Sequence, residues 1–340
     1  MEDIKRNSIN NMKKKWLIFS AMILVSGEVL FYSLLAIFNR TNAQSKHLRI
    51  HGPYFEPIKI TEFFARIPCV KIEIAGKTTT AKVDLGSNSG ISLPSDFLKE
   101  IDQKSFIRCT SYFGVRGKTY YSDVYELPKV KIGKMVLFPA TAEEINPEFE
   151  NDTDLLHNSK EHSVCDSGRI GWELFYNVNL FLDCEHSTIA FCDSLDTLKK
   201  QGYPTEAFIE TPLLLDRNLI EFEAMTGTGP LRCTLDTGST WNLLNKDLEG
   251  GSNDHMVLNL DNIDQNRVLN PENTNQLILD PEEDDCEILV FKIGKKDFGT
   301  VAFQKIKTSF GIDAIIGMEF LYSKLVFIDF PNRKIYFYEK

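Results

Sequence analysis

The sequence predicts an all-β protein made of two homologous, barrel-like lobes that follow one membrane-spanning helix. Three observations lead to this fold class. Short runs in which apolar and polar residues alternate recur along most of the 340-residue chain, as in β-strands. Four sequence blocks occur twice in the same order, which indicates an internal duplication. One long apolar run follows a basic N-terminal segment.

The N-terminal segment has the pattern of a membrane anchor. Residues 1–15 contain five Lys and Arg residues, and the mostly apolar residues 16–38 follow them. A helix of that length would be about 34 Å long, enough to span a membrane. Glu28 would cost about 3 kcal/mol at mid-helix, which its apolar neighbours offset. We therefore expect a single-pass membrane protein with a cytoplasmic N-terminus and extracytoplasmic lobes. A cleaved signal peptide and secretion are the alternative.

The composition argues against one class of partner and favours strands. The formal net charge is −10, which argues against a nucleic-acid partner because such partners favour basic surfaces. The 24 Phe and 11 Tyr residues favour strands.

The repeated blocks define two units. The matching pairs are 81–87 with 233–239, 130–142 with 291–303, 170–175 with 316–321, and 181–193 with 327–339. The offset between the copies changes along the chain, and the extra residues fall in polar segments of the kind that loops tolerate. We expect a first repeat at 61–195 and a second repeat at 213–340, joined by a linker at 196–212 and preceded by a linker at 39–60.

Each repeat is predicted to consist of β-hairpins. Alternating runs flank Gly76 in the first repeat and Gly227 in the second. Further hairpins are expected at the two Ile-Gly-Lys blocks, at the short segment between Cys184 and Cys192, and at Pro331. Short helices are expected only near 95–102 and 319–324.

An aspartate ends the second strand of the first hairpin in each repeat, and a glycine follows two residues later. The pairs are Asp84 with Gly86 and Asp236 with Gly238. Two adjacent carboxyl groups can hydrolyse a peptide bond without a metal or cofactor. Since both cannot ionise cheaply, they share one proton, so one group takes a proton from water while the other donates one. The glycines leave room for this approach because they lack a Cβ.

A hydroxyl residue follows each glycine. Ser87 and Ser239 could each bond the outer oxygen of the neighbouring carboxylate and fix its orientation. An isolated Asp-x-Gly after a strand is usually a turn. The collinear match between the two copies favours a catalytic pair instead.

The second repeat resembles a known family. Residues 235–240 read LDTGST, residues 242–244 read NLL, and residues 312–321 read IDAIIGMEFL. These motifs resemble those of the retropepsin-like and pepsin-like aspartic proteases, in which Asp-Thr-Gly carries the catalytic aspartate and an apolar-apolar-Gly block packs behind its loop. The resemblance covers about residues 61–340. It implies a monomeric active unit with two acid-protease-type β-barrel lobes, the active site between them, and no metal or cofactor.

The first repeat departs from the family pattern twice. Leu85 stands where the family has Thr, whose hydroxyl bonds across to the other half, so Thr237 would brace the site from one side only. Losing one such bond removes about 0.5–1.5 kcal/mol, which would loosen the pair without abolishing it. Arg169 stands at the position of Ile315 in the apolar block.

A hairpin in the first repeat fits the flap that covers the substrate in this family. It spans residues 109–126, with Gly114 and Gly117 near the tip and Tyr112 and Tyr120 beside it. An ordinary surface hairpin with packed tyrosines is the alternative.

Two patterns of cysteine and histidine residues could indicate a metal site or a disulfide, but neither is a strong signal. The spacing of His157, His162 and Cys165 is not a usual zinc pattern, so no metal site is expected. Cys184 and Cys192 could form a disulfide or remain buried thiols.

Together these features predict an aspartic-type endopeptidase acting on a peptide or protein substrate. The alternative is a catalytically weak or inactive module of the same fold that binds peptides.

Overall fold

The computed structural model describes residues 54–64, 66–113, 119–137, 140–146, 167–215, 219–246, 286–306 and 312–340. Strands dominate these residues, so the all-β prediction is confirmed. In this part of the chain no helix is long and apolar enough to cross a membrane. The predicted anchor at 16–38 lies outside the described residues.

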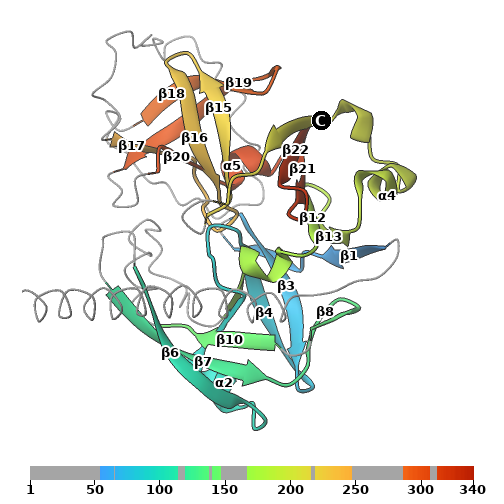
Figure 1. Cartoon of the computed structure of the whole chain (residues 1–340), viewed down its shortest axis with the longest axis vertical. Coiled ribbons are helices and arrows are strands. Elements are labelled where there is room, and N and C mark those ends of the chain that lie inside the picture. Colours follow the sequence, from blue (N-terminus) through green and yellow to red (C-terminus); the bar gives the residue numbers. More distant parts are fainter. Residues whose placement is uncertain are drawn as a thin grey trace, which may run out of the picture. The chain divides into compact units, whose positions relative to one another are not determined.

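The first repeat forms a ten-stranded sheet with the order β6-β7-β10-β5-β11-β4-β3-β8-β9, and β2 pairs with β3 (Figure 1). The strands are β2 (Glu62–Phe64), β3 (Ile67–Ile74), β4 (Lys77–Asp84), β5 (Ile91–Leu93), β6 (Ser105–Phe113), β7 (Thr119–Leu127), β8 (Val130–Ile132), β9 (Met135–Leu137), β10 (Ala140–Glu144) and β11 (Gly168–Gly171). The short helix α2 (Ser95–Lys99) follows β5, as predicted.

The second repeat forms a closed barrel with the order β15-β16-β20-β17-β19-β18. Its strands are β15 (Glu221–Thr226), β16 (Gly229–Leu235), β17 (Leu243–Asn245), β18 (Cys286–Ile293), β19 (Lys296–Ile306) and β20 (Ala314–Ile316). Helix α5 (Met318–Leu321) follows β20 at the second position where a short helix was expected.

A six-stranded sheet takes strands from both repeats in the order β1-β13-β12-β21-β22-β14. Its strands are β1 (Phe55–Lys59), β12 (Asn179–Asp183), β13 (Thr188–Cys192), β14 (Ile209–Pro212), β21 (Lys324–Asp329) and β22 (Lys334–Glu339). At its centre β12 pairs with β21, with Phe181 opposite Phe327. The matching blocks at the ends of the two repeats therefore meet in one sheet.

Both segments that were expected to be linkers contain regular structure. Residues 39–60 include β1, and residues 196–212 include most of α4 (Leu195–Lys200), all of η4 (Thr205–Ala207) and β14. Strands β1 and β14 are the two edges of the six-stranded sheet, where β1 pairs with β13 and β14 pairs with β22. Helix α4 begins after Ser194, whose side chain accepts a hydrogen bond from Thr197 N–H.

The predicted hairpins are present, and left-handed glycines form several of their turns. Gly76 has φ +81° between β3 and β4. Gly133 and Gly294 occupy matching turns of the two repeats and have φ +60° and +57°. A residue with a Cβ is strained in this conformation, so these turns explain why the Gly-Lys blocks recur.

The strands around each aspartate have the same arrangement in both repeats. Strand β4 runs parallel to β11, β11 is antiparallel to β5, and β5 is parallel to β10. In the second repeat β16, β20, β17 and β19 show the same sequence of pairings. The duplication read from the sequence is therefore also a repetition of local topology.

The main hydrophobic core contains residues of both repeats. A smaller cluster covers the other face of the six-stranded sheet, where Leu198 of α4 packs with Phe181 and Phe327. Both faces of β12 and β21 are thus buried, which explains their almost continuous apolar sequences.

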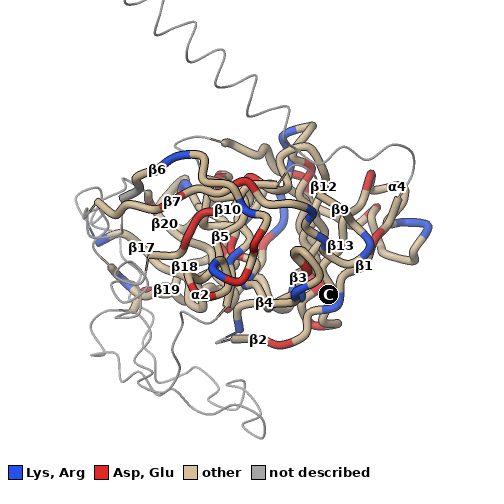
Figure 2. The backbone as a smooth tube through the Cα atoms, turned by 90° about the horizontal axis from the view of Figure 1, so that it is seen from below, with Lys and Arg blue, Asp and Glu red and all other residues tan. Residues whose placement is uncertain are grey.

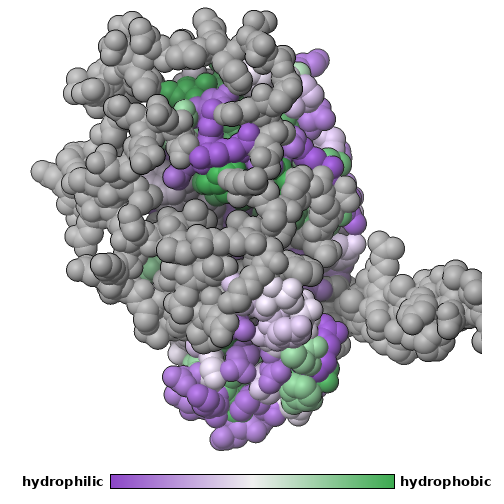
Figure 3. Space-filling model, turned by 90° about the vertical axis from the view of Figure 1, so that its left-hand side faces the viewer, coloured by the Kyte–Doolittle hydropathy of each residue, from purple (hydrophilic) through white to green (hydrophobic). Residues whose placement is uncertain are grey.

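The surface of the described part is mixed in character. Acidic and basic residues are interspersed along the backbone (Figure 2). On the face shown in Figure 3, hydrophilic and hydrophobic side chains are also interspersed.

Cys184 and Cys192 are buried free thiols, so of the two alternatives for this pair the structure has thiols and not a disulfide.

Candidate active site

The structure brings Asp84 and Asp236 together. Asp84 is the last residue of β4, and Asp236 directly follows β16. A Cβ added at Gly86 would overlap the carboxyl group of Asp236, and one at Gly238 would overlap that of Asp84. Each glycine therefore leaves space for the aspartate of the other repeat, as the sequence predicted.

Backbone contacts within each repeat hold the two aspartate loops in place. Trp172 N–H donates to the Ser87 carbonyl over 3.0 Å, and Met318 N–H donates to the Ser239 carbonyl over 2.8 Å. A Cβ at Gly171, which ends β11, would overlap the backbone of the first loop. Gly317 stands in the same relation to the second loop. The matching blocks at 169–171 and 315–317 thus pack directly behind the loops that carry the aspartates.

The two carboxyl groups accept different numbers of backbone hydrogen bonds. Asp236 Oδ1 accepts from Gly238 N–H over 2.7 Å and from Gly86 N–H over 3.1 Å. Asp84 Oδ1 accepts from Ser87 N–H over 3.1 Å. Both glycine N–H groups are therefore directed at Asp236.

The hydroxyl groups of the two serines do not have the predicted role. Ser87 Oγ is 2.8 Å from Ser89 Oγ, and Ser239 Oγ donates to the Trp241 carbonyl over 2.8 Å. Ser87 instead contributes its backbone N–H to Asp84. The two serine hydroxyls stabilise the aspartate loops instead. A loop that turns sharply after a strand has backbone polar groups that need side-chain partners.

Thr237 connects the two repeats. Its hydroxyl donates to the Val83 carbonyl over 2.6 Å and accepts from Leu85 N–H over 3.0 Å. The side chain is fully buried. This single residue therefore satisfies two backbone groups of the opposite aspartate loop, in agreement with the predicted one-sided brace.

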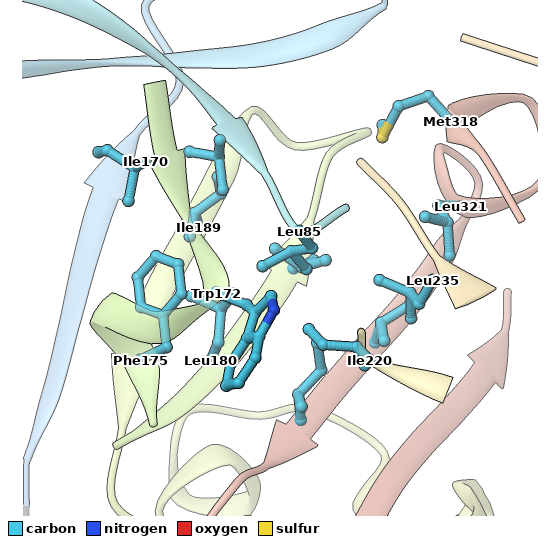
Figure 4. Close-up of a cluster of buried hydrophobic side chains, with 14 of the residues drawn as sticks. Leu85, Ile170, Trp172, Phe175, Leu180, Ile189, Ile220, Leu235, Met318 and Leu321 are labelled. Carbon is cyan, nitrogen blue, oxygen red and sulfur yellow. The ribbon is translucent and has the colours of Figure 1, made fainter. Parts of the chain in front are cut away.

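Leu85 is fully buried in the main core. Figure 4 shows it between Trp172 of the first repeat and Leu235 and Ile220 of the second. The expectation that Leu85 would loosen the pair considered only the lost hydroxyl. The structure shows that a leucine at this place contributes apolar packing between the repeats, and burial of a side chain of this size contributes about 1.5–3 kcal/mol.

Arg169 is part of the site, which the sequence analysis missed. Its Nε lies 3.1 Å from Asp84 Oδ2, and both side chains are 17% exposed. Arg169 lies opposite Lys82 in the β11–β4 pairing, just as Ile315 lies opposite Thr234 in the β20–β16 pairing. The departure from the apolar pattern was visible in the sequence, but only the parallel pairing of β4 and β11 reveals the contact.

Asp236 has a strongly altered acidity. Burial, and next the negative charge of Asp84, raise the pKa of Asp236 from 3.8 to about 8. The N–H groups of Gly238 and Gly86 oppose this change but do not reverse it. A carboxyl group whose pKa is raised beside a second carboxyl group is suited to hold a proton that the pair can use in general acid–base catalysis.

The hairpin that was expected to form a flap consists of β6 and β7, with Tyr112 opposite Tyr120. Tyr120 is only 2% exposed, so it is a packed residue of the hairpin and not a free surface side chain. Gly114, Gly117 and the side chain of Tyr112 lie outside the described residues.

The residues considered as metal ligands, His157, His162 and Cys165, also lie outside the described part. Among the residues that the structure does describe, no group of three or more His, Cys, Asp or Glu side chains could hold a metal ion.

Comparison with known proteins adds no assignment. The chain matches no protein-family model, and a search of curated proteins finds no match.

Proposed function

We propose that this chain is an aspartic endopeptidase of the retropepsin-like and pepsin-like type, with Asp84 and Asp236 as its catalytic pair. The observation that carries the proposal is the mutual approach of the two Asp-x-Gly turns. Each glycine adjoins the carboxyl group of the other repeat, so two aspartates 152 residues apart in sequence form one site.

The chemistry follows from the shared proton. In the first step the ionised carboxylate takes a proton from a water molecule, and the water oxygen attacks the peptide carbonyl carbon. The protonated carboxyl donates its proton to the carbonyl oxygen. In the second step the first group returns its proton to the leaving nitrogen as the C–N bond breaks, and the second regains a proton as the new carboxyl forms. The pair ends in its starting state.

The repeated topology supports a bilobal organisation of this enzyme. The four strands around each aspartate pair in the same way, and Thr237 links the two aspartate loops. We propose one acid-protease-type lobe per repeat, with the active site between the lobes in a single chain. The anchor at 16–38 would hold these lobes on the extracytoplasmic side of a membrane, where they would meet peptide or protein substrates.

Cleavage of a peptide library by the purified full chain in detergent tests the proposal. Asp84→Asn and Asp236→Asn should each reduce cleavage at least about 100-fold, the lower range for loss of a general acid or base. Asp96→Asn is the matched control, since Asp96 is an exposed aspartate that pairs only weakly with Lys99 at the surface. Wild-type activity in either Asp84→Asn or Asp236→Asn would refute the catalytic pair. A folded wild type that binds peptides but cleaves none would favour the peptide-binding alternative.

A further inference from the structure

One of the differences between the two repeats beside the proposed catalytic pair is a charge. In the second repeat the strand next to Asp236 carries Ile315, whereas the first repeat places Arg169 at the corresponding register. Arg169 Nε approaches Asp84 Oδ2 to 3.1 Å in surroundings where both side chains are 17% exposed. An ion pair with so little solvent is screened less than a surface pair, so the cation strongly favours a negative charge on its partner.

The two aspartates have different types of hydrogen-bond donor. Both oxygens of Asp84 have a donor, because Ser87 N–H reaches Oδ1 and Arg169 reaches Oδ2. Asp236 accepts two backbone N–H groups on Oδ1. Arg169 places a full positive charge beside Asp84, whereas Asp236 receives only the partial charges of two backbone N–H groups, so Asp84 is the better place for the negative charge of the pair.

Other charged groups lie around Arg169. Ser92 of β5 lies between Arg169 and Glu143 of β10 in the strand register. Burial, and next the charge of Glu173, raise the pKa of Glu143, whereas Arg108 and Arg169 lower it. Glu143 therefore also feels the charge of Arg169, and Glu173 lies close enough to Glu143 to raise its pKa.

Lys82 is the cation opposite Arg169 on the neighbouring strand β4. Its Nζ lies 4.4 Å from the centre of the Phe64 ring. Lys82 therefore has an aromatic partner, and Arg169 contacts Asp84 directly.

We propose that Arg169 is a positioning residue that holds Asp84 as the carboxylate, so that Asp84 is the base and Asp236 the acid of the pair. The inference rests on the proposed function for its catalytic meaning. In the first step the proton of the attacking water goes to Asp84, and the proton of Asp236 goes to the carbonyl oxygen of the peptide. In the second step Asp84 returns its proton to the leaving nitrogen and Asp236 regains one. The raised pKa of Asp236 agrees with this assignment.

A spectroscopic experiment tests the assignment without requiring activity. The full chain is labelled with ¹³C at the Asp carboxyl carbons, and the two signals are assigned with Asp84→Asn and Asp236→Asn. Near neutral pH the wild type should show Asp84 as a carboxylate and Asp236 as an acid. In Arg169→Gln the proton should redistribute toward Asp84, whereas Arg169→Lys should retain the wild-type pattern. A protonated Asp84 in the wild type, or unchanged signals in Arg169→Gln, would overturn the proposal.

The pH dependence of cleavage gives the second readout. Arg169→Gln and Arg169→Ile, which introduces the residue type of the second repeat, should shift the acid limb of kcat/KM to higher pH. At about pH 4 their rates relative to neutral pH should fall at least about ten-fold, while Arg169→Lys follows the wild type. Lys131→Gln removes one charge from a half-exposed pair with Glu73 and should not alter the profile.

The two readouts separate the possible failures. If the signals follow the assignment but the wild type cleaves nothing, the proposed function fails and the proton assignment stands. If the wild type cleaves and folded Arg169→Gln and Arg169→Ile retain its pH profile, the role of Arg169 fails and the enzyme assignment stands.

Discussion

Replacing Thr237 with Val should uncouple the two repeats to a measurable extent. Val has the branched shape of Thr but no hydroxyl, so the packing around this fully buried position is largely preserved. The change removes the donor to the Val83 carbonyl and the acceptor for Leu85 N–H. Each buried polar group that loses its partner costs about 1–3 kcal/mol, so the free energy of unfolding should fall by about 2–6 kcal/mol.

Thr234, on strand β16 just before Thr237, provides a matched control. It is 2% exposed, and its hydroxyl has no hydrogen-bond partner within the described part of the chain. Thr234→Val should therefore leave the stability within about 0.5 kcal/mol of wild type or raise it, because it removes an unsatisfied group.

Urea unfolding of the full chain, followed by tryptophan fluorescence and by circular dichroism, measures both variants. The urea midpoint of Thr237→Val should lie well below that of Thr234→Val, and the slope should be unchanged if the native structure persists. Equal midpoints for the two variants would refute the view that the Thr237 hydroxyl links the repeats.

Three further predictions follow from the site. Gly86→Ala should abolish cleavage and lower stability because its Cβ would overlap the carboxyl of Asp236, whereas Gly90→Ala should do neither, since a Cβ there meets no atom within 4 Å; equal activity of both variants would contradict the close approach. Leu85→Ala should lower the free energy of unfolding by about 2–5 kcal/mol in urea titrations through the cavity it leaves between the repeats, and a loss below about 1 kcal/mol would mean that Leu85 is not packed there. Because the pKa of Asp236 is about 8 in the folded state and 3.8 is its ordinary value, the folded protein binds this proton more tightly than the unfolded chain. The stability that this proton contributes is therefore fully present below about pH 4 and is lost as the pH rises through about 8. Asp236→Asn should flatten the decline in urea midpoint over this pH range. An unchanged decline in the variant would contradict the raised pKa of Asp236.

Local sequence patterns predicted most of the strands and their turns. Alternation of apolar residues identified the hairpins around Gly76 and Gly227, because side chains on a strand point to opposite faces in turn. The edges of the six-stranded sheet were not predicted. Strands β1 and β14 have partners far away in sequence, so nothing in their own residues distinguishes them from linkers.

Sequence comparison within the chain also predicted the pair of aspartates. Asp84 was identified because it occupies the same place in its repeat as Asp236, and the catalytic interpretation followed from two carboxyl groups and their glycines. The orienting role of the serine hydroxyls was not predicted correctly. A hydroxyl can bond several nearby backbone or side-chain groups, and the choice depends on distances of a few tenths of an ångström that a motif does not contain.

The sequence by itself determined the strand periodicity, the duplication and which residues correspond in the two copies, since these properties depend on the order of side chains along the chain. Only the tertiary structure decided which two backbone groups the Thr237 hydroxyl bonds, that Leu85 packs between the repeats, and that Arg169 contacts Asp84. Those contacts arise where strands distant in sequence pair in a particular register. A charged residue in an apolar block reads as a defect along the chain, but in the folded protein it lies beside the carboxylate whose charge it stabilises.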